Sequence, residues 1–89
     1  MSIRSEPVVQ IDTPDWAPLE AAIGPKLTGW FMWMHEIRLI GGPSVHAYKH
    51  IATRRYLHLA GDGRAFIYLG DGSYRATPLD AALATAFSR

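Results

Sequence analysis

Between residues 44 and 77 the chain reads SVHAYKHIATRRYLHLAGDGRAFIYLGDGSYRAT, a run of short β-favouring segments separated by turn residues. Asp62-Gly63 and Asp71-Gly72 are strong signals for tight turns between antiparallel strands. The segments around these turns alternate apolar and polar residues with a period of two, as half-buried strands do. We therefore expect strands at residues 44–50, 54–59, 64–69 and 74–76, joined in chain order as a meander.

A further strand is expected before this run, because residues 30–40 are rich in bulky, strand-favouring side chains and end at Gly41-Gly42-Pro43. The first half of this strand is apolar on both faces and needs cover on both sides. Helices, the N-terminal arm or a second copy of the chain can supply that cover. The last of these predicts a homodimer through Trp30, Met32 and Met34.

A helix is expected before the meander. Thr13-Pro14-Asp15 carries capping side chains, and Gly24-Pro25 is a good stop. Between them the apolar residues Trp16, Leu19 and Ile23 recur at helical spacing.

A second helix is expected after the meander. Thr77-Pro78 repeats the same start chemistry, with Thr77 as the cap and Pro78 in the first position. Leu79, Leu83 and Phe87 then form an apolar stripe.

These segments predict an α+β fold, in which an antiparallel β-meander of about five strands has an N-terminal and a C-terminal helix packed on one face. Residues 1–12 are left unassigned, as an extended arm or an edge strand. The length of 89 residues predicts a single domain over residues 1–89.

Composition excludes several classes of protein. The chain has no cysteine, so disulfides, thiolate metal sites and cysteine nucleophiles are ruled out. The first residues lack the apolar core of a secretion signal, and no apolar run approaches the roughly 20 residues that a membrane span needs. We expect a cytoplasmic protein that does not insert into a membrane and that carries no cofactor.

The middle of the chain is basic although the net charge is only +1. Residues 37–64 carry Arg38, Lys49, Arg54, Arg55 and Arg64 against Asp62 alone. Three histidines lie in the same stretch, and residues 1–36 before it are acidic, so a basic segment follows an acidic one.

Alternation predicts one candidate binding surface. With Val45, Ala47, Leu57, Leu59, Ile67 and Leu69 as the buried face, the opposite face carries aromatic, imidazole and guanidinium groups. The predicted binding residues are His46, Tyr48, Lys49, His50, Arg54, Tyr56, His58 and Tyr68, with Phe66 on the same face.

Such a face fits a non-catalytic binding module with a protein or single-stranded nucleic-acid partner, because bases stack on aromatic rings and phosphates meet cations. The same pairs also stabilise a half-exposed sheet without any ligand. The alternative function is a small metal-independent nuclease or hydrolase using His50, Arg54 and His58 as acid, base and charge stabiliser. A metal site is not expected, because His46 and His50 lie about 13 Å apart on a strand.

Three segments of the chain resemble, in their general residue pattern, small uncharacterised proteins of actinobacteria and their phages. These segments are residues 29–34 (GWFMWM), residues 46–50 (HAYKH), and residues 53–59 (TRRYLHL) with Asp62-Gly63-Arg64. The resemblance spans roughly residues 15–87 and implies a bacterial source with a GC-rich genome, without implying a function.

Overall fold

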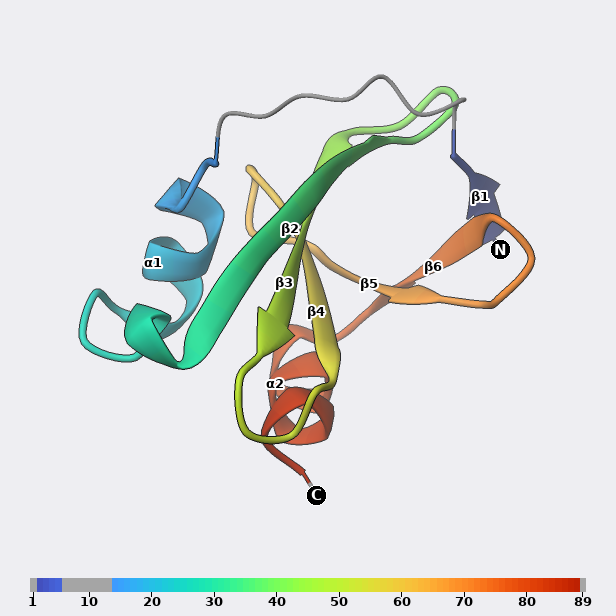
Figure 1. Cartoon of the computed structure of the whole chain (residues 1–89). Helices are drawn as coiled ribbons and strands as arrows, with labels where there is room; N and C mark the ends of the chain where they lie inside the picture. Colours follow the sequence, from blue (N-terminus) through green and yellow to red (C-terminus); the bar gives the residue numbers. More distant parts are fainter. Residues whose placement is uncertain (1, 6–13, 89) are drawn as a thin grey trace.

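A computed structural model describes residues 2–5 and 14–88 of the chain. Within them, six strands form one antiparallel sheet, and two α-helices and one short 3-10 helix accompany it. The elements are β1 (Ser2–Arg4), α1 (Ala17–Ile23), η1 (Thr28–Trp30), β2 (Phe31–Arg38), β3 (Ser44–His50), β4 (Tyr56–Ala60), β5 (Ala65–Tyr68), β6 (Ser73–Thr77) and α2 (Leu79–Phe87). This architecture confirms the predicted α+β class (Figure 1).

The sheet curls until its two outer strands meet at one end. Its strand order is β1-β6-β5-β4-β3-β2, so β2 to β6 form a meander and β1 adds to the far edge of β6. Beyond β1, Ser5 bridges to Leu39, and the Ile40 N–H donates to the Arg4 carbonyl at 2.8 Å. In Figure 1, β5 and β6 accordingly run across the direction of β2 to β4. The result is a partly closed barrel.

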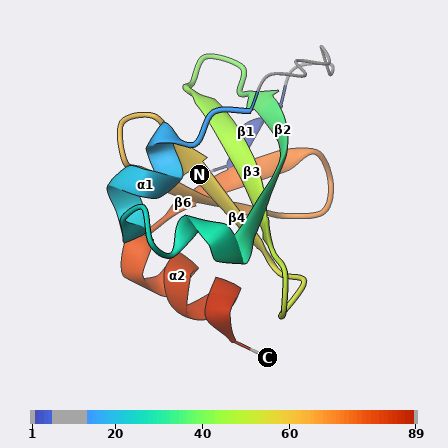
Figure 2. The same ribbon diagram turned by 60° about the vertical axis from the view of Figure 1, so that its left-hand side comes forward.

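Both faces of the sheet bury apolar side chains. On one face, which we call the helix face, Tyr48, Leu57 and Leu59 pack with Leu19 of α1 and with Ala82 and Ala86 of α2. Figure 2 shows the two helices lying together on one side of the strands. The opposite face, which we call the His58 face, contributes a second cluster inside the curl of the sheet, formed by Ile37, Leu39, Val45, Ala47, Ala60, Phe66 and Tyr74.

The N-terminal stretch and the helix starts differ in part from the expectations. Part of the unassigned N-terminal stretch forms a sixth strand, β1, whereas residues 6–12 and the candidate cap Thr13 lie outside the described residues. The other candidate cap, Asp15, accepts the Ala17 N–H through Oδ1 at 3.0 Å, although Trp16 occupies the capping position. Thr77 does not cap α2, because it ends β6 and Pro78 takes the capping position without a side-chain hydrogen bond. Within the described residues, no helix is long and apolar enough to cross a membrane.

One prediction about the sheet is wrong, namely that the following residues share a single face: His46, Tyr48, His50, Tyr56, His58, Phe66 and Tyr68. Direct cross-strand partners share a face, and Ala47 lies opposite His58 while Tyr48 lies opposite Leu57. Even-numbered residues of β3 therefore share a face with odd-numbered residues of β4. The predicted surface splits, with His46, Tyr48 and His50 on the helix face and Tyr56, His58, Phe66 and Tyr68 on the His58 face.

The alternation pattern failed at β3 because both of its faces are buried. Val45 and Ala47 belong to the cluster inside the curl, and Tyr48 belongs to the cluster under the helices. Alternation of apolar and polar residues identifies the buried face of a strand only when the other face is exposed to solvent. The expected burial of Ile67 and Leu69 is also wrong, since they are 39% and 41% exposed.

Candidate functional site

The β3 histidines have structural partners under the helices. The Trp33 indole N–H donates to Nδ1 of His46 at 3.1 Å, and Nε2 of His46 lies 3.7 Å from Oδ2 of Asp15. This chain of contacts ties β2 and β3 to the segment that enters α1. Because both ring nitrogens of His46 face protein groups, His46 is poorly placed to act on a ligand.

Tyr48 is also enclosed. Its hydroxyl donates to the backbone carbonyl of Asp15 at 2.6 Å, and the ring is fully buried. Burial, together with the nearby Asp15 carboxylate, raises the pKa of Tyr48. The side chain is therefore a neutral anchor between β3 and α1.

His50 organises the turn between β3 and β4. Its Nδ1 accepts the backbone N–H groups of Ala52 and Thr53, each at 3.1 Å. Its ring is stacked on Trp30 and meets the edge of Phe87 at a centroid distance of 4.9 Å. Only 4% of the residue is exposed, so His50 is a packing residue.

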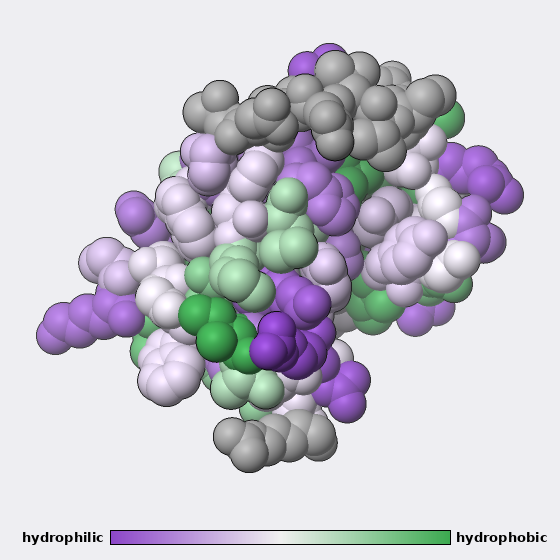
Figure 3. Space-filling view, viewed as in Figure 1, coloured by the Kyte–Doolittle hydropathy of each residue, from purple (hydrophilic) through white to green (hydrophobic). Residues whose placement is uncertain are grey.

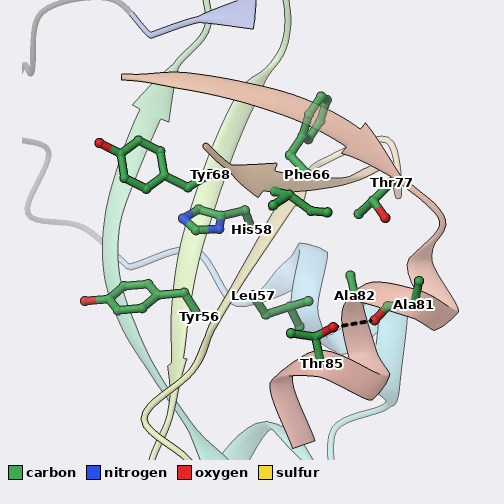
Figure 4. A pocket seen from close by; sticks show the side chains of 10 residues that line it. Tyr56, Leu57, His58, Phe66, Tyr68, Thr77, Ala81, Ala82 and Thr85 are labelled. Carbon is green, nitrogen blue, oxygen red and sulfur yellow. Dashed lines mark hydrogen bonds between the residues drawn. The ribbon is translucent and has the colours of Figure 1, made fainter. Parts of the chain in front are cut away.

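The His58 face carries the accessible part of the predicted surface. Tyr56 and Tyr68 are 41% and 48% exposed, and His58 lies recessed between them on the same face (Figure 4). The Tyr56 ring is stacked against the His58 imidazole at 5.8 Å, and the Lys49 ammonium lies over the Tyr56 ring, also at 5.8 Å. Tyr68 is held by its hydroxyl, which accepts the Gly72 N–H at 3.3 Å.

His58 is a neutral imidazole at the floor of this surface. Burial, together with repulsion from His35 on the same face, lowers the pKa of His58 to about 4. Its ring meets the Tyr74 ring edge-on at 5.3 Å. No described residue hydrogen-bonds to the His58 imidazole, so one donor and one acceptor remain for a ligand or water.

A pocket of about 240 Å³ opens beside His58. Four residues of the His58 face line it, with Leu57 and Ile67 from the same strands, Thr77 from β6, and Ala81, Ala82 and Thr85 from α2 (Figure 4). The Thr85 hydroxyl donates to the Ala81 carbonyl at 3.1 Å, which leaves the pocket with a mostly apolar wall. None of the lining side chains is a carboxylate, ammonium or guanidinium group.

The pocket exists because β4 and β5 separate early. Their pairing comprises His58 with Phe66 and Leu59 with Ala65, and the next residues of both strands line the pocket instead. The small side chains of Ala81 and Ala82 face the gap from α2 and do not fill it.

The residues of the alternative nuclease are not brought together. His50 lies on the helix face and His58 on the opposite face, so they cannot flank one phosphate. Arg54 lies in the loop between β3 and β4 with a positive φ of 65°, and its N–H donates to the His50 carbonyl. Among the residues that the structure describes, no group of three His, Asp or Glu side chains could hold a metal ion.

The predicted dimer residues are accessible. Trp30, Met32 and Met34 are 52%, 38% and 37% exposed, and a bulge in β2 lies between Trp33 and His35. Figure 3 shows hydrophobic side chains beside strongly hydrophilic ones over the lower part of the sheet. The homodimer stays a prediction.

Sequence reasoning missed six of the ten residues that line the pocket, among them Thr77, which was expected to cap a helix. Leu57 and Ile67 were assigned to a buried core, and Ala81, Ala82 and Thr85 were not considered as site residues. The sequence holds no clear signal for these residues, because alanines in α2 also occur where the helix packs closely on the sheet, as Ala86 does.

Comparison with known proteins adds no assignment. The chain matches no protein family, and neither the curated proteins nor the solved structures contain a match to it.

Proposed function

We propose that this domain is a non-catalytic protein-interaction module, and that its working surface is the pocket mouth formed by Tyr56, His58 and Tyr68. The observation that carries the proposal is a mostly apolar pocket rimmed by two half-exposed tyrosines. Tyrosines around a desolvated pocket are typical of the residues that dominate binding energy in protein interfaces.

The volume of the pocket supports a large partner rather than a free small molecule. Sites for whole ligands usually measure about 300–1,000 Å³. A pocket of about 240 Å³ fits one apolar or aromatic side chain. The rest of the partner would then lie on the rim.

The lining favours a side chain over a nucleobase. A base that entered the pocket would place its polar edge against Leu57, Phe66 and Ala82, and unpaired polar groups are costly to bury. Stacking on the rim is also restricted, because His58 and Lys49 already lie against the Tyr56 ring.

Phage display of random dodecapeptides on the immobilised domain tests this function. We expect selected peptides that share one apolar or aromatic residue and that bind the soluble domain saturably in fluorescence anisotropy. Ala81→Leu should weaken their binding at least tenfold, because the larger side chain fills the pocket.

Ala84→Leu is the matched control, since Ala84 is exposed on the same helix and does not line the pocket. Peptides that bind Ala81→Leu as well as the native domain would refute the proposal. So would a labelled single-stranded RNA or DNA whose binding, unlike that of peptides, is lost in Ala81→Leu.

A further inference from the structure

The gap between β4 and β5 exposes backbone groups as well as a pocket. In an antiparallel ladder, hydrogen-bonded pairs alternate with non-bonded pairs. The Ala60 N–H donates to the Arg64 carbonyl, so the next hydrogen-bonded pair is His58 with Phe66. The pair after that would be Tyr56 with Tyr68, and it does not form between the two strands.

The outer neighbours of the two strands lead to the same conclusion. The His50 N–H donates to the Arg55 carbonyl, which directs the odd-numbered residues of β4 toward β3. The Leu69 N–H donates to the Ser73 carbonyl, which directs the odd-numbered residues of β5 toward β6. The backbone N–H and C=O groups of Tyr56 and Tyr68 therefore point into the gap.

The charges around the gap are uneven. At the Tyr56 end, the Lys49 ammonium lies over the ring. Arg75 is the cross-strand partner of Ile67 and therefore lies on the helix face, opposite to Lys49. It is exposed and forms no ion pair with another described residue. The nearest carboxylate in sequence to the lining is Asp80, at the first turn of α2, where it accepts the Ala81 N–H.

Building on the proposed function, we infer that the partner is an extended, acidic peptide segment. Its backbone hydrogen-bonds to Tyr56 and Tyr68, and one apolar side chain enters the pocket. Asp or Glu residues on either side of that side chain meet Lys49 on the His58 face and Arg75 on the helix face. Several kinds of partner could place an apolar group in the pocket. An extended peptide also has backbone N–H and C=O groups that can hydrogen-bond to the unpaired backbone groups of Tyr56 and Tyr68. Because each face beside the gap carries a cation and no carboxylate lines the pocket, acidic residues next to the apolar side chain are favoured.

Three pools of fluorescein-labelled heptapeptides test this inference. In each pool the central residue is an equal mixture of Leu, Ile, Phe and Trp, and the flanking residues are Asp/Glu, Lys/Arg or Ser/Gly. Binding is measured by anisotropy at neutral pH in 50 and 200 mM NaCl. We expect the acidic pool to bind at least tenfold more tightly than the basic pool, with a smaller difference at the higher salt.

Lys49→Glu and Arg75→Glu should each remove most of this preference, and the double variant should reverse it. Lys26→Glu is the matched control, because it makes the same charge change in the exposed turn between α1 and η1. Backbone recognition is checked with the acidic pool methylated on the amide nitrogens next to the central residue, which should lose binding.

The outcomes separate the two proposals. If all three pools bind equally and Ala81→Leu weakens each of them, the acidic partner is refuted and the pocket function stands. If the acidic pool is preferred but methylation has no effect, extended backbone recognition is refuted. If no pool shows binding that depends on Ala81, the proposed function fails as well.

Discussion

Replacing His58 with phenylalanine should remove a pH-dependent loss of stability. His58 is 8% exposed, and burial together with repulsion from His35 lowers its pKa to about 4 from the usual 6.5. The unfolded chain therefore binds more protons than the folded chain between these two values. Stability contributed by the neutral ring is fully present above about pH 6.5 and is lost as the pH falls toward 4.

The size of the loss follows from the pKa difference. A shift of one pKa unit corresponds to about 1.4 kcal/mol, so His58 accounts for about 3 kcal/mol over the whole window. Between pH 7 and pH 5 the single-site linkage relation gives a loss of about 2 kcal/mol. Asp62 and Asp71 do not interfere, because hydrogen bonds from Arg64 and Ser73 lower their pKa values and place their titration below this interval.

Urea unfolding followed by tryptophan fluorescence at pH 7, 6 and 5 measures the effect. Phenylalanine keeps an aromatic ring between Tyr56 and Tyr74 and has no proton to bind, so His58→Phe should show a flatter dependence on pH than the native chain. The difference between the two free energies of unfolding should change by about 2 kcal/mol from pH 7 to pH 5. Parallel curves for the two proteins would refute the assignment of His58 as a buried neutral imidazole.

Two further pairs of substitutions test the anchor at α1 and the turn between β3 and β4. Tyr48→Phe removes the hydroxyl that donates to the Asp15 carbonyl and should lower the free energy of unfolding in urea by about 1–2 kcal/mol. Tyr56→Phe, at an exposed ring, should lower it little. Equal losses would contradict the difference in burial between the two rings. Arg54→Gly should leave stability unchanged or raise it by up to about 1 kcal/mol, because glycine adopts a positive φ without strain, while Arg55→Gly loses the hydrogen bond from its guanidinium to the Ser88 carbonyl and should destabilise. A thermal melt in which Arg54→Gly loses more stability than Arg55→Gly would overturn this assignment.

Strand positions were readable from the sequence because turn residues and β-favouring residues act locally. Asp62-Gly63 and Asp71-Gly72 mark turns that the structure confirms, and each predicted strand overlaps an observed one. The helix positions were readable for the same reason. Closure of the sheet could not be predicted from the sequence. The contact of Ser5 with Leu39 joins segments that are far apart in the chain, so it leaves no local sequence pattern.

The candidate site was half predictable. Aromatic residues on strands could be nominated, and Tyr56, His58 and Tyr68 do share an accessible face. His46, Tyr48 and His50 have the same residue types but lie under the helices, where Trp33, Asp15 and the turn amides bind them. Residue type alone does not separate a ligand-facing histidine from one that has found protein partners.

The register of the β3–β4 pairing decides which histidines and tyrosines lie under the helices and which lie on the accessible face. A shift of one residue in strand pairing moves every side chain to the other face. Residues 51–55 join His50 to Tyr56, and Arg54 takes a left-handed conformation that lets its N–H return to the His50 carbonyl. If Tyr48 paired with His58 instead of Leu57, His58 would lie on the face of Tyr48 and the pocket would lose its imidazole floor. The loop conformation therefore sets the composition of the site, and no side chain in the site itself carries that information.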